Sequence, residues 1–302
     1  MLIIFNPKAG QRRRQRLDRA LKVLRRLGQD FTLVETGHPG HAALLAREGA
    51  SEGQAVVVAA GGDGTIAEVA AGLAGAGTGA GAALGVLPLG TANVFAWELG
   101  IPVRPELSAR LLMEGEARLV HPGEARFDDG GARLFVQMLG AGFDAAVVAN
   151  LDLGLKRRIG RGAYVWQAVR ELGRYRFPPL RVVFADGETL VSSVIVSKGR
   201  LYAGRHLLAP AAEMGQPGFQ VALFHGSGPV AAAAYGAALP FNLLPRMPGL
   251  ALRHATWLRI EGEGVAVQAD GDPVGRLPVE VRVAPAPLHV VLPQVTGLAL
   301  AA

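Results

Sequence analysis

The sequence of 302 residues contains no cysteine. Disulfides, thiolate zinc sites, iron–sulfur clusters and cysteine nucleophiles are therefore excluded. Aromatic residues are also scarce, at 6% of the chain. Because no RNA- or DNA-binding signature accompanies them, we expect no nucleic-acid partner. Disorder is not expected, since half of the residues are hydrophobic and 19% are charged, which suffices for a packed core.

A long uninterrupted hydrophobic run is missing as well. The longest apolar stretch, residues 229–252, is broken by Pro240, Pro245, Arg246 and Pro248, whereas a membrane-spanning helix needs about 20 unbroken apolar residues. The N-terminal run MLIIF is too short for a signal-peptide core and follows no basic region. We therefore expect a soluble, cytoplasmic chain. Residues 229–252 belong either to the core or to a surface that faces an acyl chain or a membrane.

Basic charge is concentrated near the N-terminus. The formal net charge is +6, yet residues 1–28 carry nine basic side chains against one acid, Asp18. Such a segment is either a solvated helix face or a surface for anionic lipid or nucleotide phosphates. Lys156, Arg157 and Arg158 form a smaller basic cluster with the same two interpretations.

The pattern of apolar residues divides the chain near Val120. Before it, the sequence predicts strands over residues 2–5, 31–34, 55–60 and 84–87, and helices over 17–27, 42–47, 65–73 and 91–99. This alternation is typical of a doubly wound, mostly parallel α/β sheet. After it, hairpin turns at 128–131 and 186–187 indicate mostly antiparallel β structure. Strands are expected over 181–185, 189–196, 265–268, 279–283 and 289–292, with one helix over 162–172.

Three turns at predicted strand ends carry the chemistry of this first half. Gly61-Gly62-Asp63-Gly64-Thr65 lies between a strand and a helix, where unpaired backbone N–H groups and the helix dipole favour phosphate. Asp63 would repel phosphate there unless it binds magnesium or holds the loop. Residues 87–93 repeat this pattern, with Thr91 and Asn93 as a helix cap or as phosphate ligands. Residues 6–10 form the third turn, and strand ends of a parallel sheet meet at one edge, where ligands bind.

One acidic motif lies late in the chain. Asp270-Gly271-Asp272 provides either a base and a metal ligand or an ordinary turn. The Walker P-loop and H-E-x-x-H patterns are absent from the sequence.

Taken in order, these motifs resemble the diacylglycerol kinase catalytic domain family, which includes sphingosine kinases and bacterial lipid kinases and is distantly related to NAD kinases. The matching segments are 6–10, 61–65 with Glu68, 88–93, 140–145 and 270–272. The resemblance implies a nucleotide-binding α/β domain over 1–120 and a β-sandwich-like, mostly antiparallel lipid-substrate domain over 121–284. It also implies a cleft between them and a return of residues 285–302 to the first domain.

The same resemblance implies roles for individual residues. ATP would lie on Gly61, Gly62, Asp63, Gly64, Thr65, Ile66 and Ala67, with contributions from Asn6, Thr36, Gly90, Thr91 and Asn93. Asp272 would accept the proton of the lipid hydroxyl. Asp270 and Asp63 would act beside it by holding the catalytic Mg²⁺ and balancing charge on the transferred group.

The sequence departs from the family pattern at several positions. Val94 and Trp97 stand where the family often has an acid and an arginine, and Asp272 is one methylene shorter than the usual glutamate. Many bacterial members also carry a structural magnesium loop with an aspartate before a glycine. The matching stretch here is residues 214–219, with Pro217 in place of the acid, so we expect no structural metal.

The sequence therefore predicts an ATP- and Mg²⁺-dependent lipid kinase that phosphorylates a hydroxyl of a diacylglycerol-like or sphingoid lipid. Peripheral membrane contact follows from a lipid substrate, and the oligomeric state is open, a homodimer included. Two alternatives stand beside it. The first is an NAD kinase-like enzyme, although Asn93-Val94 lacks the acid expected for ribose. The second is a non-catalytic lipid- or nucleotide-binding regulator.

Overall fold

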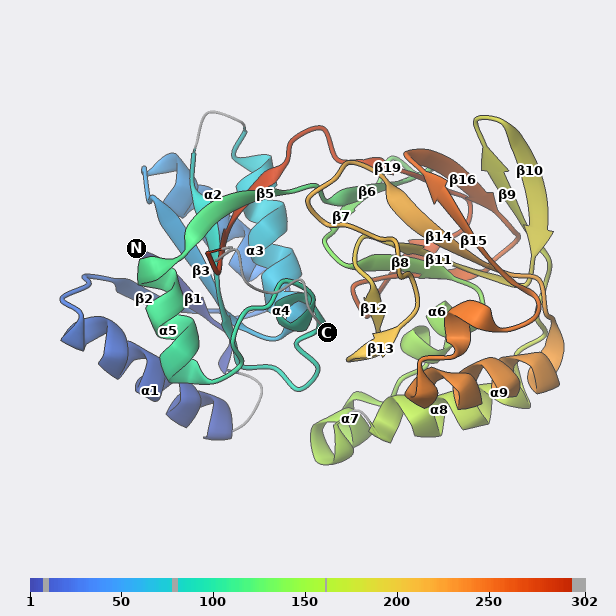
Figure 1. Cartoon of the computed structure of the whole chain (residues 1–302), viewed down its shortest axis with the longest axis horizontal. Helices are drawn as coiled ribbons and strands as arrows, with labels where there is room; N and C mark the ends of the chain where they lie inside the picture. Colours follow the sequence, from blue (N-terminus) through green and yellow to red (C-terminus); the bar gives the residue numbers. More distant parts are fainter. Residues whose placement is uncertain (8–10, 78–80, 161, 295–302) are drawn as a thin grey trace. The chain divides into compact units, whose positions relative to one another are not determined.

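The computed structural model describes residues 1–7, 11–77, 81–160 and 162–294. The chain folds into two compact units. One comprises Met1–Val120 together with the segment that begins at Leu288, and the other comprises His121–Pro287 (Figure 1).

The first unit is built on a mostly parallel sheet with strand order β2-β1-β3-β4-β20-β5. The strands are β1 (Leu2–Phe5), β2 (Thr32–Glu35), β3 (Val56–Gly61), β4 (Ala83–Pro88), β5 (Glu116–Val120) and β20 (Leu288–Leu292). The central strands are short apolar runs buried on both faces, as parallel sheets require. The register aligns Phe5 with Ala60 and Gly61 with Pro88. The segments that follow β1, β3 and β4 therefore start at one edge of the sheet.

The helices of this unit are α1 (Gln11–Arg26), α2 (His41–Ser51), α3 (Asp63–Gly75), α4 (Val94–Glu98) and α5 (Pro105–Glu114). Helix α1 is amphipathic, and its apolar positions Leu17, Ala20, Leu21 and Leu24 are buried. The predicted helix over 91–99 is shorter than expected, because α4 begins only at Val94. Helix α5 is not among the predicted elements.

Several arginines of α1 have partners inside their own unit. Arg16 donates to the carbonyls of Pro88 and Val103 at 2.9 and 2.8 Å. Arg14 pairs with Glu35, and Arg19 pairs with Glu106. Part of the basic N-terminal segment therefore connects α1 to the sheet and to α5, a role that neither sequence interpretation included.

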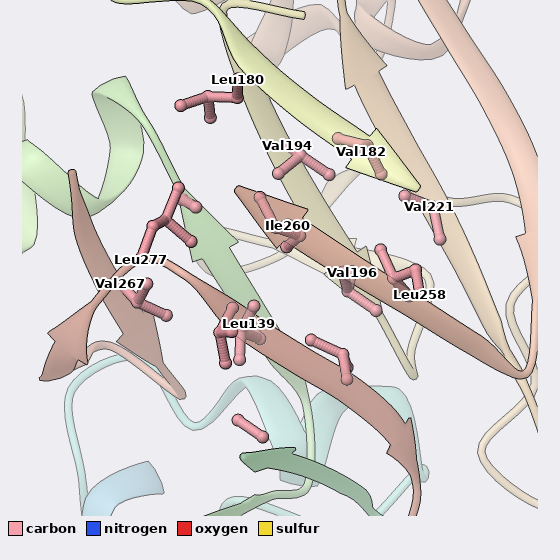
Figure 2. Packing of buried hydrophobic residues seen from close by; sticks show 14 of the residues in the cluster. Leu139, Leu180, Val182, Val194, Val196, Val221, Leu258, Ile260, Val267 and Leu277 are labelled. Carbon is pink, nitrogen blue, oxygen red and sulfur yellow. The ribbon is translucent and has the colours of Figure 1, made fainter. Parts of the chain in front are cut away.

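The second unit contains two antiparallel sheets with strand orders β10-β9-β16-β19-β6-β7 and β15-β14-β11-β8-β17-β18. Their strands are β6 (Gly123–Phe127), β7 (Ala132–Phe135), β8 (Met138–Ala141), β9 (Leu180–Phe184), β10 (Gly187–Val191), β11 (Ser193–Ser197), β14 (Phe219–Phe224), β15 (Leu250–Ala255), β16 (Trp257–Glu261), β17 (Ala266–Ala269), β18 (Asp272–Arg276) and β19 (Val279–Val283). Apolar side chains of both sheets share one core, in which Val194 and Val196 lie near Leu258 and Ile260 (Figure 2).

The predicted hairpins at 128–131 and 186–187 are confirmed as β6–β7 and β9–β10. The predicted single strand over 189–196 is wrong, because it is two strands, β10 and β11, in different sheets. Ser192 lies at the crossover, where its backbone N–H donates to the Phe224 carbonyl at 2.8 Å and its hydroxyl donates to the Gly226 carbonyl at 2.6 Å. These bonds hold the chain where it changes sheet.

The second unit also contains the helices α6 (Phe143–Ala149), α7 (Leu153–Ile159), α8 (Gly162–Leu172) and α9 (Gly228–Ala238), the short 3-10 turns η2 (Leu239–Phe241) and η3 (Leu244–Arg246), and a small ribbon of β12 (Leu201–Tyr202) and β13 (His206–Leu207). Helix α8 contacts both α7 and α9, and the three lie together in Figure 1. Within the described ranges, no helix is both long enough and apolar enough to cross a bilayer.

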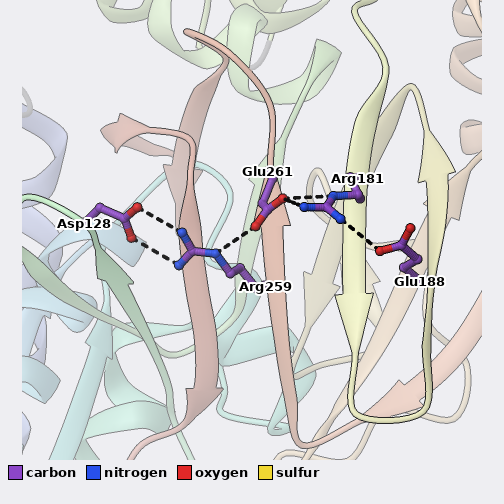
Figure 3. A network of polar contacts seen from close by, with 5 residues as sticks. All are labelled: Asp128, Arg181, Glu188, Arg259 and Glu261. Atoms are coloured by element: carbon purple, nitrogen blue, oxygen red, sulfur yellow. Dashed lines mark hydrogen bonds and ion pairs between the residues drawn. The ribbon is translucent and has the colours of Figure 1, made fainter.

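A charged network crosses the sheet that contains β9 and β16 (Figure 3). Arg259 makes two parallel bonds to Asp128, at 3.1 and 2.9 Å, and a third to Glu261 at 3.0 Å. Arg181 continues the network from Glu261 to Glu188. Because these groups are solvent-accessible, the ion pairs contribute little to the free energy of unfolding. Their main effect is to favour this pairing of strands.

Candidate functional site

The strand ends of the first unit bring the predicted nucleotide residues together. The N–H of Leu89 donates to the Gly61 carbonyl at 2.8 Å, which ties the turn after β4 to the turn after β3. Asn6 donates through its side chain to Thr65 Oγ1 at 3.4 Å. Thr36 follows β2, and its N–H donates to the Phe5 carbonyl at 2.8 Å. Residues 8–10 of the first turn lie outside the described residues.

Two glycines set how closely the turns approach. A Cβ atom on Gly90 would lie 2.6 Å from the Cα atom of Gly62, and 2.6 Å from Asn93 Oδ1. No real side chain tolerates such contacts, so only glycine allows this packing. The glycines therefore serve the contact between the two turns, in addition to leaving backbone N–H groups accessible.

Helix α3 presents its N-terminus to the same edge. Its first intrahelical bond is from Ile66 N–H to the Gly62 carbonyl at 3.1 Å, so the preceding N–H groups have no acceptor in the helix. The side chains of Thr65, Ile66 and Ala67 are buried. Of these residues, Ile66 and Ala67 can therefore offer a nucleotide only their backbone. Glu68 accepts from the N–H groups of Gly40 and Ala42 and so fixes the start of α2.

Asp63 organises the second turn. Its carboxylate accepts the Phe95 N–H at 3.1 Å. Burial raises the pKa of Asp63, while hydrogen bonds from the backbone of Phe95, Val94 and Asn93 act in the opposite direction. The start of α4 is therefore capped by an acid from α3. Of the two roles that the sequence leaves open for Thr91, the helix cap does not fit, because Thr91 precedes the first turn of α4 and is exposed.

Asn93 holds an unusual conformation beside this turn. Its backbone is left-handed at φ 51°, and its side-chain amide donates to the Gly90 carbonyl at 2.9 Å. Its Oδ1 atom is buried and has no hydrogen-bond partner among the described residues. A buried acceptor without a donor costs about 1–3 kcal/mol, so this atom suits a ligand hydroxyl or amino group.

The two aspartates of the acidic turn in the second unit lie in different environments. Asp270 adopts φ 51° and accepts three backbone N–H bonds, from Val136 and Gln137 at 2.8 Å and from Met138 at 3.0 Å. Asp272 begins β18, and its side chain is exposed. Asp270 thus fixes the turn to the start of β8, whereas Asp272 is presented to solvent.

A buried polar chain supports this turn, and sequence reasoning missed most of it. Tyr202 donates to the carboxylate of Asp144, and Gln268 donates to the other oxygen of Asp144 at 2.9 Å. The Oε1 atom of Gln268 accepts the Gly271 N–H at 2.9 Å. Burial raises the pKa of Asp144. Only Asp144 had a sequence signal, as part of the 140–145 motif, while Tyr202 and Gln268 had none.

The two predicted magnesium ligands have backbone partners in the structure. Asp63 and Asp270 both use their oxygens as acceptors for backbone N–H groups. No group of three or more histidine, aspartate or glutamate residues suited to a metal ion occurs in the described part of the chain. A carboxylate that already accepts three backbone bonds has little capacity left for a cation. Both residues therefore hold turns in place, and their role as magnesium ligands stays a prediction.

A parallel α/β unit with glycine turns at its strand ends, followed by an antiparallel β-sandwich-like unit, is the architecture of the diacylglycerol kinase fold. A solved structure of a diacylglycerol kinase from Bacillus anthracis has this fold, with a TM-score of 0.73 at 22% identity over 96% of each chain.

Family models agree with the fold. The model "Diacylglycerol kinase catalytic domain" matches residues 1–125, and "YegS C-terminal NAD kinase beta sandwich-like domain" matches residues 137–292. A Pseudomonas aeruginosa protein named "Probable lipid kinase YegS-like" is 30% identical over 97% of this chain and 94% of its own. "Probable lipid kinase YegS" of Escherichia fergusonii is 27% identical over 97% of this chain and 95% of its own. The chain belongs to the YegS-like lipid kinases of the diacylglycerol kinase family.

Proposed function

We propose that the protein transfers the γ-phosphoryl group of ATP to a hydroxyl of a diacylglycerol-like or sphingoid lipid. The observation that carries this proposal is the contact between Gly62 and Gly90, which places two glycine turns and the N-terminus of α3 at one sheet edge. Phosphoryl transfer depends mainly on positioning and charge neutralisation. Backbone N–H groups at a helix N-terminus supply both for an anionic nucleotide.

Within this proposal, the first unit binds ATP. The N–H groups of residues 61–67, with Gly90, would face the phosphates, and Thr65, Thr91 and Thr36 would offer hydroxyls. Asn93 Oδ1, buried without a donor, would accept from the nucleotide. Asn6 would line the same site through its contact with Thr65.

The second unit contributes the general base. Asp272 is the carboxylate of the acidic turn that remains exposed, and it would take the proton of the lipid hydroxyl during attack on the γ-phosphorus. Asp270 would act by fixing the turn. Magnesium enters the proposal only as the ion that accompanies ATP, and none of the described side chains is assigned to it.

A contact with the membrane surface is part of the proposal. Val165, Trp166 and Val169 of α8 are each more than half exposed, as are Val230 at the start of α9 and Phe241 of η2. Helix α8 contacts α9, which contacts η2, and large exposed apolar side chains on neighbouring elements indicate an interaction surface. The exposed Arg158, Arg170 and Arg174 lie on or beside α7 and α8, so an anionic bilayer complements the surface in both apolarity and charge. Lys156 and Arg157 have side chains outside the described set.

The test is turnover of radiolabelled ATP with magnesium over lipids in mixed micelles. The panel comprises diacylglycerol, monoacylglycerol, sphingosine, ceramide, phosphatidylglycerol and undecaprenol, with NAD as a further acceptor. Label in one lipid that disappears with Asp272→Asn supports the proposal and identifies the substrate. Label in NAD would replace it with the NAD kinase alternative. ATP binding without transfer to any acceptor would favour the non-catalytic regulator.

A further inference from the structure

Lys198 is a fully buried basic residue directly after β11, with no exposed surface. The chain has four lysines among its 31 basic residues, and charged side chains are almost never fully buried unless they are paired. No carboxylate lies within ion-pairing distance of Lys198 in the described ranges. Other groups must therefore offset the cost of burying the Lys198 charge.

The partners of the ammonium group are backbone carbonyls and an aromatic face. Lys198 Nζ donates to the carbonyl of Gln216 at 2.8 Å and to that of Gly218 at 2.6 Å. The same nitrogen lies 5.5 Å from the ring centroid of Phe219. Carbonyl oxygens from a tight loop and a ring face are groups that bind a cation.

The loop that supplies these carbonyls is held by a hydrogen bond within the loop and by one to a neighbouring segment. Gln216 N–H donates to the Glu213 carbonyl at 3.2 Å, and the carbonyl of Met214 accepts the His121 N–H at 2.9 Å. Gly218 has φ +116°, a conformation that favours glycine, and a Cβ there would lie 2.6 Å from His254 Nε2. These restraints direct the two carbonyls toward Lys198.

We propose that the Lys198 ammonium is the built-in cation of the 213–219 loop and holds it as a bound metal ion would. Pro217 supplies no carboxylate for a metal, and the ammonium already engages the carbonyls of its two neighbours. A divalent ion would meet a like charge at this place, so the structural magnesium loop of the family does not fit this chain.

The backbone of Lys198 connects the same residue to the acidic turn. The backbone N–H of Lys198 donates to the Gln137 carbonyl at 2.9 Å, and the backbone N–H of Gln137 donates to Asp270. The second unit therefore holds its turn without a divalent ion. Any magnesium requirement of the protein then belongs to the nucleotide and not to the fold.

The test is thermal unfolding of the full chain in EDTA and in 10 mM Mg²⁺, with metal content measured on the EDTA-dialysed protein. We expect the wild-type Tm to differ by less than about 1 °C between the two conditions, with no stoichiometric metal. Lys198→Met should lower the Tm by about 5 °C, because two carbonyls lose their donor. Lys22→Met, at an exposed lysine of α1, is the matched control and should leave the Tm unchanged.

A second variant tests the cation itself. Lys198→Ala leaves space beside the carbonyls, and methylammonium should raise its Tm more than tetramethylammonium, which has no N–H donor. A wild type that loses stability in EDTA, a Lys198→Met variant as stable as the control, or equal effects of the two amines would overturn the proposal.

If neither Lys198 variant folds, ¹⁵N-lysine spectra of the wild type test the proposal instead. A slowly exchanging Lys198 ammonium is expected, and one that exchanges as fast as Lys22 contradicts the proposal.

Discussion

The Cα atom of Gly62 lies 2.6 Å from the position that a Cβ atom on Gly90 would occupy. The two turns of the proposed nucleotide site touch through these residues, and a methyl group at position 90 must push them apart. We expect Gly90→Ala to weaken ATP binding at least about tenfold, or about 1.4 kcal/mol, in calorimetric titration. Gly173→Ala is the control, because a Cβ there would meet no atom within 4 Å. Unchanged affinity of Gly90→Ala would argue against a site at this contact.

The two acids of the 270–272 turn should respond differently to loss of charge. Asp272→Asn should reduce lipid phosphorylation by about 10²–10⁴-fold, because a general base contributes that much, while the Tm and ATP affinity stay at wild-type values. Asp270→Asn should lower the Tm, since an amide accepts the three backbone N–H bonds less strongly than a carboxylate. The pair is compared by turnover and thermal unfolding. Equal turnover in Asp272→Asn and wild type would remove Asp272 from the mechanism.

Gln268 is expected to act as a positioning residue. Gln268→Leu leaves the Gly271 N–H and a buried oxygen of Asp144 without their partner, at a cost of about 1–3 kcal/mol. If this bond aligns Asp272, kcat should fall while the KM for ATP stays constant. Gln220→Leu, in the same sheet, loses a bond from Ala211 N–H and should lower stability without lowering kcat. Parallel losses of kcat in both variants would indicate a purely structural effect.

Stability should depend on Lys198 in alkaline solution. Burial lowers the pKa of Lys198 from 10.5 to about 8, so between these values the unfolded chain holds more protons than the folded one. Stability therefore rises with pH over this window, by at most about 3 kcal/mol. The neutral amine keeps two N–H donors, enough for its two carbonyls. Denaturant unfolding at pH 7.5 and 9.5 should show this gain in the wild type and not in Lys198→Met.

His121 does not contribute to the change in stability between pH 7.5 and 9.5. Burial and the nearby Lys198 charge lower the pKa of His121 below its ordinary 6.5, so it is already neutral at pH 7.5. An identical pH response in wild type and Lys198→Met would show that another group is responsible.

The exposed face of α8 should govern membrane binding. Trp166→Ala combined with Val169→Ser should reduce cosedimentation with phosphatidylglycerol vesicles by about tenfold, because it removes apolar area that would enter the headgroup region. Leu190→Ser is the control, since Leu190 is equally exposed on β10. Salt should weaken the remaining, arginine-dependent binding. Equal losses in the control would point to nonspecific apolar binding.

The parts of the site that depend on local sequence could be predicted. The apolar run into Gly61–Thr65 specifies a strand, a turn and a helix within a dozen residues, and the turns at 128–131 and 186–187 fix their hairpins. Parallel strand order then brings the strand ends together without further information.

The remaining features depend on contacts between distant residues. Asp63 accepts an N–H from Phe95, 32 positions away, at the start of α4, and capping rules applied to residues 91–93 cannot reveal this contact. Asp270 accepts N–H groups more than 130 positions earlier in the chain, which no local pattern reveals. No local pattern in the sequence distinguishes Lys198 from a surface lysine, and only the fold places it beside two backbone carbonyls.

The position of β20 has a consequence for biosynthesis. This strand pairs with β4 on one side and β5 on the other, so the sheet of the first unit has a gap until residues 288–292 leave the ribosome. A nascent chain can complete the second unit while the first still exposes two unpaired edges. A fragment that ends at residue 120 should consequently aggregate, and adding a peptide with the β20 sequence in trans should restore its solubility.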